Sequence, residues 1–276
     1  MPSKTTAKKK ASTPAPEAPK AATIEDRGAQ IEERLRKTDA SFQASWRESL
    51  DISWIYHDSA LEGVVYTFQE LKTAIDPMGV VLADSTLQPA CEEIRRHREA
   101  LNYVRDYAPK KRQPISLDVI KTIYLLIHPE EGDLKSVRYR KDIPQHRLYF
   151  HEYAPPDKIT YRMRQIVDWV NDPETRGTRN SVRIAARAHY DLLRVFPFAQ
   201  DSGKVARLFM NLLLLRSGYP PAIVHSTERQ RYYDALKGSS ATMTQIVQEA
   251  IENNLASTEK MLDAYERPQP SDAPPR

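Results

Sequence analysis

Apolar residues recur along most of the chain at the three-to-four-residue spacing of an amphipathic helix. Phe42, Trp46, Leu50 and Trp54, for example, fall on one face of a helix over residues 42–56. Patterns of this kind predict ten helices, over residues 24–36, 42–56, 68–75, 88–107, 116–127, 156–170, 182–195, 204–217, 228–237 and 242–267.

One segment departs from the helical spacing. Residues 137–151 are rich in Arg, Tyr and Phe and carry Pro144 near their middle. This composition predicts a short β-hairpin and not the core of a sheet. The sequence therefore predicts an all-α fold with a small β-hairpin.

The two ends of the chain differ from the middle. Residues 1–22 have no large apolar side chain after Met1, and residues 267–276 carry four prolines, so both are predicted to be disordered. Five lysines against Glu17 in the first of these tails account for the whole net charge of +4. Because the body of the chain is then neutral, we do not expect nucleic acid as a partner.

The expected compartment is the cytoplasm. No apolar run approaches the roughly 18 residues of a membrane span, and the first residues lack the apolar region of a secretory signal. A single cysteine, Cys91, excludes a disulfide within the chain and fits a reducing environment.

The histidines and the cysteine do not indicate a metal centre or a thiol nucleophile. None of the seven histidines forms the HxH, HxxxH or HExxH spacing of a metal site. Cys91 lies among charged residues of a predicted helix, where a structural role is expected.

The loop between two predicted helices is the most unusual local stretch. An apolar helix ends at Val195, and Pro197 prevents it from continuing. Lys204 then opens a new helix, so residues 196–203 form a short connection that leads into a helix N-terminus.

This helix N-terminus has the elements of an anion site. Asp201, Ser202 and Gly203 precede or begin the helix, whose free N–H groups and dipole attract negative charge. Lys204 and Arg207 are three residues apart and share one face of the first turn. An ordinary loop with Asp201 or Ser202 as helix cap fits the same residues, and both interpretations stay open.

The surrounding sequence resembles the Fic (Fido) family. The family motif runs His-Pro-Phe-x-Asp/Glu-Gly-Asn-Gly-Arg-x-x-Arg, and this chain has FPFAQDSGKVAR at residues 196–207. The sequence DSALEG at 58–63 looks like the inhibitory-helix signature (Ser/Thr)-x-x-x-Glu-(Gly/Asn) of the family. Further segments resemble the region of the family's flap hairpin, at 127–128, 132–140 and 154–156, and the motif after its core, at 228–236.

The resemblance implies a division of the chain. The expected parts are the tail 1–22, N-terminal helices with the inhibitory-helix-like segment at 23–110, a Fic-like core at 111–240, a C-terminal helix at 241–266 and the tail 267–276.

Members of the family that are enzymes mostly transfer AMP from ATP to a hydroxyl of a target protein, with Mg²⁺. Several motif positions of this chain depart from that chemistry. Phe196 stands where the family has its general base, and Gln200 where it has the acidic Mg²⁺ ligand. Asp201 replaces a glycine, Ser202 the asparagine that holds a phosphate, and Lys204 the first arginine. A phenyl ring cannot take a proton, and a neutral amide is a poor ligand for a hard cation.

The remaining matches imply roles without catalysis. The residues expected to bind a ligand are Ser202, Gly203, Lys204 and Arg207. Those expected to regulate the site are Glu62, Gly63 and Arg207, and those expected to form the flap are Tyr149, Phe150 and His151. No catalytic residue and no metal ligand is assigned.

The leading functional prediction is a Fic-fold pseudoenzyme that binds a nucleotide or another phosphorylated ligand without transferring AMP. One alternative is an enzyme of altered chemistry that uses Glu62 or Asp201. Another is a protein adenylyltransferase with an unrecognised base, which would need ATP and Mg²⁺ and a protein target. The resemblance also predicts that the carboxylate of Glu62 lies within about 4 Å of the Arg207 guanidinium.

Overall fold

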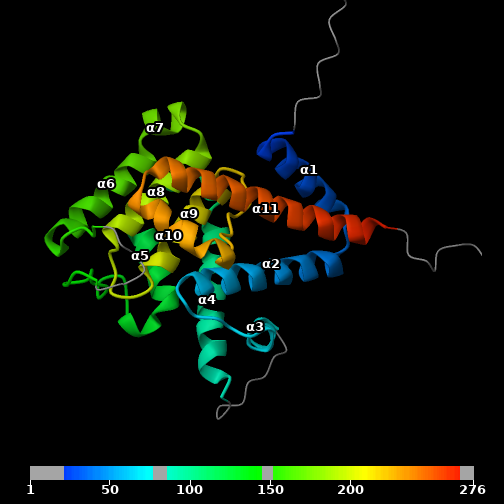
Figure 1. The fold of residues 1–276 in the computed structure, drawn as a ribbon, viewed down its shortest axis with the longest axis horizontal. Helices are drawn as coiled ribbons and strands as arrows, with labels where there is room; N and C mark the ends of the chain where they lie inside the picture. Colours follow the sequence, from blue (N-terminus) through cyan, green and yellow to red (C-terminus); the bar gives the residue numbers. More distant parts are fainter. Residues whose placement is uncertain (1–21, 77–85, 145–151, 268–276) are drawn as a thin grey trace, which may run out of the picture.

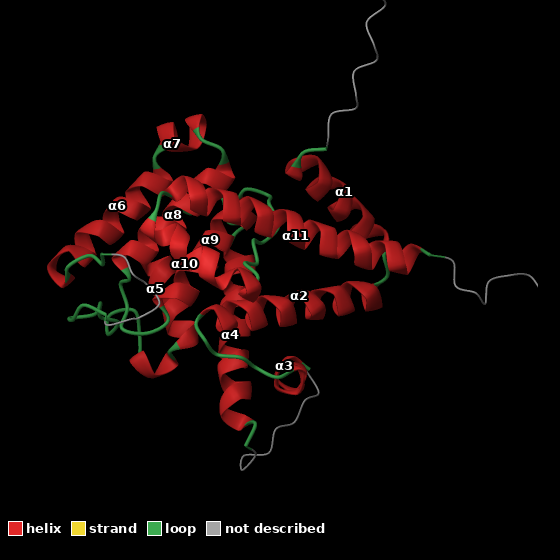
Figure 2. Ribbon diagram, in the orientation of Figure 1, coloured by secondary structure: helices red, strands yellow, loops and turns green. Residues whose placement is uncertain are grey.

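The structure is a computed structural model that describes residues 22–76, 86–144 and 152–267. Within these ranges the chain forms α-helices joined by loops and short 3-10 helices, and it has no strand (Figure 2). None of the helices in these ranges combines the length and the hydrophobicity that crossing a membrane requires. The α-helices are α1 (Ile24–Lys37), α2 (Ala40–Leu61), α3 (Phe68–Ile75), α4 (Gln88–Tyr107), α5 (Leu117–Ile127), α6 (Ile159–Asn171), α7 (Pro173–Thr178), α8 (Ser181–Val195), α9 (Ser202–Arg216), α10 (Arg229–Lys237) and α11 (Ser240–Glu266).

The predicted all-α fold is confirmed, and each predicted helix is present. The helix α2 ends at Leu61, five residues beyond the predicted end at residue 56, because the polar run His57-Asp58-Ser59 is buried. The helix α7 was not predicted, since its sequence PETRGT has no apolar periodicity. Asp172 caps it by accepting a hydrogen bond from the Thr175 amide at 2.9 Å.

The predicted β-hairpin is not shown. Residues 137–144 form a loop without strands, and residues 145–151, with the expected flap residues Tyr149, Phe150 and His151, lie outside the described residues. The two predicted tails lie outside them as well, apart from their innermost residues, Ala22 and Arg267.

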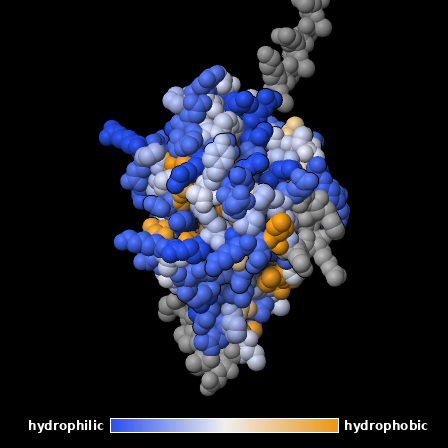
Figure 3. Space-filling view, turned by 90° about the vertical axis from the view of Figure 1, so that its left-hand side faces the viewer, coloured by the Kyte–Doolittle hydropathy of each residue, from blue (hydrophilic) through white to orange (hydrophobic). Residues whose placement is uncertain are grey.

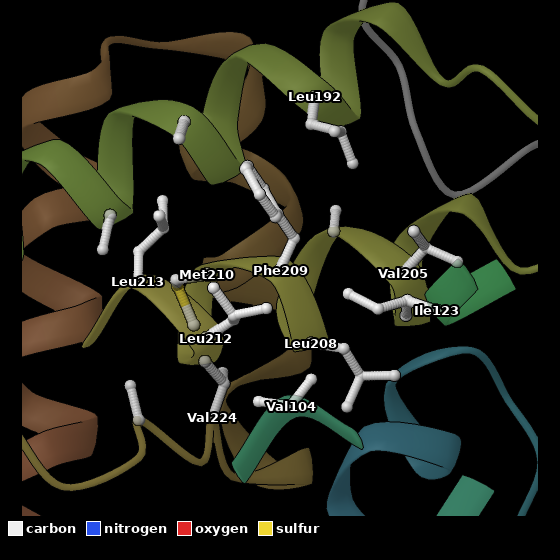
Figure 4. Close-up of a cluster of buried hydrophobic side chains, with 14 of the residues drawn as sticks. Val104, Ile123, Leu192, Val205, Leu208, Phe209, Met210, Leu212, Leu213 and Val224 are labelled. Atoms are coloured by element: carbon white, nitrogen blue, oxygen red, sulfur yellow. The ribbon is translucent and has the colours of Figure 1, made fainter. Parts of the chain in front are cut away.

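The helix α9 is the centre of the hydrophobic core. All of its residues except the last two are buried, as expected for a helix whose sides are apolar nearly all round. The helices α8, α4, α5 and α2 pack around it. Figure 4 shows Leu192 of α8, Ile123 of α5 and Val104 of α4 gathered around α9. Each is fully buried, and each such side chain contributes about 1.5–3 kcal/mol of transfer free energy.

The long helices α2 and α11 extend together away from this core, and α1 lies against the outer part of α11 (Figure 1). Arg27 of α1 donates two hydrogen bonds to the Glu259 carboxylate of α11, at 3.1 and 2.8 Å. Because partly exposed ion pairs contribute only about 0–1 kcal/mol, buried apolar residues such as Ile31 supply most of the contact energy.

The end of α2 is fixed by a glycine. Gly63 adopts a φ of 93°, which side chains with a Cβ rarely do. The amide of Gly63 donates to the Ala60 carbonyl at 3.1 Å, and the amide of Val64 donates to the Ser59 carbonyl at 3.1 Å, which is the Schellman pattern of a helix C-terminus. The helix therefore ends at Leu61, with Glu62 as its C-cap.

We expect Gly63→Ala to lower the free energy of unfolding by about 1 kcal/mol through backbone strain alone. A Cβ at this position would meet only the Arg229 Nη2 atom, at an ordinary 3.5 Å. The matched control is Gly28→Ala in α1, where a Cβ would meet nothing within 4 Å. That change should raise the free energy of unfolding by about 0.5–1 kcal/mol. Urea unfolding measures both free energies, and equal shifts of the same sign would contradict the left-handed conformation of Gly63.

Candidate functional site

The loop from α8 to α9 is bounded by two residues in the left-handed region. Phe196 has a φ of 48° and Asp201 a φ of 49°, and both conformations are uncommon for residues with a side chain. Pro197 follows the first of them, so the chain leaves α8 in a sharp turn and re-enters a helix at Ser202. Such backbone positions persist only where the surroundings hold them.

A buried arginine holds the start of this loop. Arg140 donates from Nε to the Phe196 carbonyl at 2.6 Å and from Nη2 to the carbonyls of Val195 and Ala154 at 3.0 and 2.5 Å. Its own amide donates to the Pro197 carbonyl at 2.9 Å. Burial lowers the pKa of the Arg140 guanidinium, and the carbonyl groups around it satisfy its donors.

The side chain of Phe196 points into the protein. It is 4% exposed and makes an edge contact with the Tyr153 ring at 5.3 Å between centroids. Phe198 is fully buried and stacks on Tyr124, with centroids 4.0 Å apart and the rings 4° from parallel. The two phenylalanines of the loop thus anchor it by packing.

Asp201 contacts Lys204 and His128 at the start of α9. Its carboxylate lies 2.9 Å from Lys204 Nζ and 2.8 Å from His128 Nε2, and His128 Nδ1 lies 2.8 Å from Glu130. Burial alone would raise the pKa of the Asp201 carboxyl, but His128 and Lys204 outweigh it and hold this pKa far below its usual range. Burial would likewise lower the pKa of His128, but Asp201 and Glu130 outweigh it and raise that pKa.

Ser202 and Gly203 lie at the first turn of α9 and are buried. The Ser202 hydroxyl donates to the Phe198 carbonyl at 3.0 Å and accepts from the Phe198 amide at 2.9 Å, so it closes the loop on itself. Asp201, the N-cap residue, makes no side-chain hydrogen bond to the first amides of the helix. Within the described part of the chain no side chain caps these N–H groups, which are the groups that an anion would meet.

Arg207 is buried, with 2% of its side chain exposed, and it faces two carboxylates of α2. Its Nη2 lies 2.7 Å from Glu62 Oε1, which confirms the predicted contact. Its Nε donates to the Asp58 carboxylate, and Nη2 donates to the Asp58 carbonyl at 3.1 Å. Nη1 donates to the Tyr232 hydroxyl of α10 at 3.3 Å. One guanidinium therefore joins α2, α9 and α10.

Asp58 is the less expected of the two carboxylates, since it occupies the Ser/Thr position of the family signature. Its carboxylate also lies 3.0 Å from His97 Nε2. Burial would raise the pKa of Asp58, but Arg207 and His97 outweigh burial and lower it. Asp58 is therefore a buried anion that Arg207 compensates.

The end of α2 is also held from α10. Arg229 Nε donates to the Leu61 carbonyl at 2.9 Å, and the Tyr233 hydroxyl donates to the same oxygen. The segment 228–236 thus packs on the segment 58–63, and both adjoin the α8–α9 loop through Arg207.

Two other histidines of the described residues, His189 and His57, have lowered pKa values. His189 is fully buried, its Nε2 lies 2.9 Å from the Tyr232 hydroxyl, and burial lowers its pKa to about 3. His57 packs on His225 at 3.7 Å between centroids, and burial together with His225 lowers its pKa to about 4. Neither is placed to act as a base for the loop of residues 196–201 between α8 and α9 (the motif loop).

The described residues do not offer a ready site for a divalent cation. They contain no group of three His, Cys, Asp or Glu side chains placed to hold a metal ion. Gln200 is exposed and neutral, and the neighbouring carboxylate of Asp201 is bound by Lys204 and His128. A hard cation prefers free carboxylate oxygens, so these residues do not fit Mg²⁺ in the arrangement observed.

Three residues of this site were not predicted from the sequence. Arg140 binds carbonyls of the loop from 56 residues away, and Asp58 meets Arg207 from 149 residues away. His128 lies 73 residues before Asp201. None of these positions has a local pattern that indicates its partner, although all three fall in segments that the family resemblance includes.

Residues 114–214 match the model of the Fic/DOC family. A protein adenylyltransferase Fic of Nematostella vectensis is 29% identical over 215 residues, which are 76% of this chain and 48% of that protein. The protein adenylyltransferase fic-1 of Caenorhabditis elegans is 29% identical over 186 residues, or 66% of this chain and 35% of that protein. This chain thus spans about half or less of the length of the relatives it matches.

Solved structures share the fold. A Fic-domain signalling protein of Bacteroides thetaiotaomicron superposes with a TM-score of 0.72 at 21% identity, over 90% of this chain and 100% of that chain. Fic-1 of C. elegans superposes with a TM-score of 0.66 at 23% identity, over 88% and 73% of the two chains.

The His128–Asp201 pair yields a titration prediction. Because the pKa of His128 is raised, the stabilisation from the pair is present at low pH and is lost as the pH rises through the pKa of the folded protein. In NMR titrations we expect the imidazole of His128 to titrate above about 6.5, and below its wild-type value in Asp201→Asn. The internal control is His57, expected at about 4 in both proteins. A His128 pKa that Asp201→Asn leaves unchanged would contradict the pairing.

Proposed function

Because the chain carries a Fic/DOC-type domain, we propose that it is a Fic-fold protein that binds a phosphorylated ligand or a protein partner without transferring AMP. The observation that carries the proposal is the buried phenyl ring of Phe196, packed on Tyr153 where the family has its general base. The named relatives are protein adenylyltransferases, so loss of this one activity is the point that needs testing.

Transfer of AMP to a hydroxyl requires removal of the hydroxyl proton. A positioned base contributes about 10²–10⁴-fold to such a step, and Phe196 offers neither a lone pair nor a titratable group. His128 lies beside the loop, but both of its ring nitrogens face carboxylates, of Asp201 and Glu130. An imidazole that donates from both ring nitrogens to carboxylates offers no free lone pair.

The charges around the loop argue against tight binding of ATP and Mg²⁺ in the observed state. The two cations expected to meet a phosphate are already paired, Lys204 with Asp201 and Arg207 with Asp58 and Glu62. An incoming phosphate must therefore displace these carboxylates before Lys204 or Arg207 can reach it. We infer that Ser202 and Gly203 would contribute backbone amides to such a ligand, with Lys204 as the first cation to turn toward it.

Two alternatives remain. A protein adenylyltransferase with another base is favoured by the names of the relatives. An enzyme of altered chemistry would use Glu62 or Asp201. The low pKa of Asp201 makes that carboxylate a weak base near pH 7, so Glu62 is the better candidate within this alternative.

We expect no transfer of labelled AMP from ATP by the purified protein, to itself or to added proteins, because the phenyl ring of Phe196 cannot accept the proton. The combined variant that restores the family's residues should gain self-modification, visible as an AMP adduct by mass spectrometry. That variant carries the changes Phe196→His, Gln200→Asp, Asp201→Gly, Ser202→Asn, Lys204→Arg and Glu62→Gly.

The control is the same variant without the change at Phe196, which should stay inactive. Labelling by the wild-type protein that persists in Phe196→Ala would establish another base and overturn the proposal in favour of a protein adenylyltransferase. Hydrolysis of an AMP-modified protein that Glu62→Gln abolishes would favour the enzyme of altered chemistry.

A second expectation concerns the internal carboxylates. We expect Asp201→Asn to raise the affinity for ATP in calorimetry by roughly tenfold, since it frees Lys204 and removes a negative charge from the path of the phosphates. The matched control is Asp234→Asn, because Asp234 and Lys237 form an ion pair of the same three-residue spacing, at 2.8 Å, in α10. Equal effects of the two changes, or weaker binding in Asp201→Asn, would count against a phosphate site at this loop.

A further inference from the structure

A groove lined by arginines lies beside the motif loop and not over it. It has a volume of about 1030 Å³ and is bordered by α6, α8 and the first turns of α11. One end is formed by Tyr153 and Val195, which adjoin Phe196 through the ring contact of Tyr153. Figure 3 shows the end of the molecule that carries α6 as mainly hydrophilic, with only scattered hydrophobic patches.

The charge of the groove is strongly unbalanced. Five of its lining residues are arginines and only two, Glu152 and Asp191, are acidic. Arg187 pairs with Asp191 at 2.6 Å, which leaves an excess of positive charge. The arginines are Arg162, Arg179, Arg183, Arg187 and Arg194.

Four of these five arginines have no carboxylate partner within the described residues, where Arg187 alone forms an ion pair. Arg162 of α6 and Arg183 of α8 are exposed and form no ion pair there. An exposed guanidinium offers a rigid fork of donors that binds a carboxylate through two parallel hydrogen bonds. Neutral polar side chains of the groove, such as Gln165 and Gln245, can bond the backbone of a ligand.

The spacing along α8 fits an extended chain. Arg183, Arg187 and Arg194 are separated by four and seven residues, so they lie on one side of the helix and span about 16 Å. An extended peptide covers that distance with about five residues. Acidic side chains at intervals along such a peptide would meet the arginines in turn.

A nucleic acid fits less well. The aromatic rings near the groove are covered by arginines, Trp169 by Arg179 at 5.9 Å and Tyr190 by Arg194 at 5.6 Å, and so are not free to stack on bases. Outside residues 1–22 the chain has equal numbers of basic and acidic residues, so no broad positive field attracts a long polyanion.

We propose that this groove binds an acidic, extended segment of a partner protein. The interaction rests on the part of the proposed function in which a protein partner is bound, and it names the chemistry of that partner; it uses neither the motif loop nor its cations. A partner bound there would lie beside Tyr153, and so next to the ring contact that holds Phe196.

The test is fluorescence anisotropy with the full-length protein and a labelled peptide of eight alternating Asp and Glu residues. We expect binding that weakens as salt is raised from about 20 to about 150 mM, and no binding of the matching Asn and Gln peptide. The double variant Arg162→Glu, Arg183→Glu should bind at least about tenfold more weakly. The matched control is Arg36→Glu, Arg267→Glu, which makes the same charge change at exposed positions outside the groove and should stay within about twofold of the wild type.

Three outcomes would overturn the proposal. The acidic peptide does not bind, the two double variants weaken its binding equally, or a labelled thymidine oligonucleotide binds more tightly than the peptide and loses affinity in the groove variant alone. The last outcome would assign the groove to single-stranded nucleic acid. None of these results depends on AMP transfer, and circular dichroism of each variant separates lost binding from lost folding.

Discussion

The pairing of the Arg207 guanidinium with Asp58 and Glu62 is the constraint on which the arrangement of helices around the site depends. Arg207 comes from the central helix α9, both carboxylates come from the end of α2, and the Tyr232 hydroxyl comes from α10. A buried charge without its partner costs several kcal/mol. The end of α2 must therefore stay docked on α9, and Gly63 lets the helix stop where Glu62 reaches the guanidinium.

The same principle operates on a smaller scale at the motif loop. Lys204 is paired with Asp201, which in turn is paired with His128, so the loop is electrostatically satisfied without a ligand. Such a site is stable when empty, because no cation of the loop is left buried alone. An anion that binds must therefore compete with Asp201. Its interaction with Lys204 must be more favourable than the ion pair that Lys204 already forms with Asp201.

Local patterns in the sequence predict the helices, because their amphipathic spacing is a property of neighbouring residues. The contact between Glu62 and Arg207 was also predicted, though only through the family resemblance. The second carboxylate on Arg207, Asp58, and the clamp by Arg140 were not predicted, because they join residues 149 and 56 positions apart and depend on tertiary packing. The short helix α7 was missed for the opposite reason, since it relies on a cap and a proline rather than on periodicity.

The motif loop keeps its shape through backbone hydrogen bonds and packing, neither of which needs a proton-accepting side chain at position 196. A phenylalanine in the left-handed region costs about 1–2 kcal/mol relative to helix or strand geometry. Arg140 offsets this strain by binding the carbonyls of Val195 and Phe196, and the ring adds its own burial against Tyr153. Because these contacts fix the backbone, exchanging a proton-accepting residue for an apolar one at this position can remove chemistry and leave the fold intact. The loop can then bind a ligand without a catalytic side chain, because packing and hydrogen bonds to its carbonyls maintain its backbone.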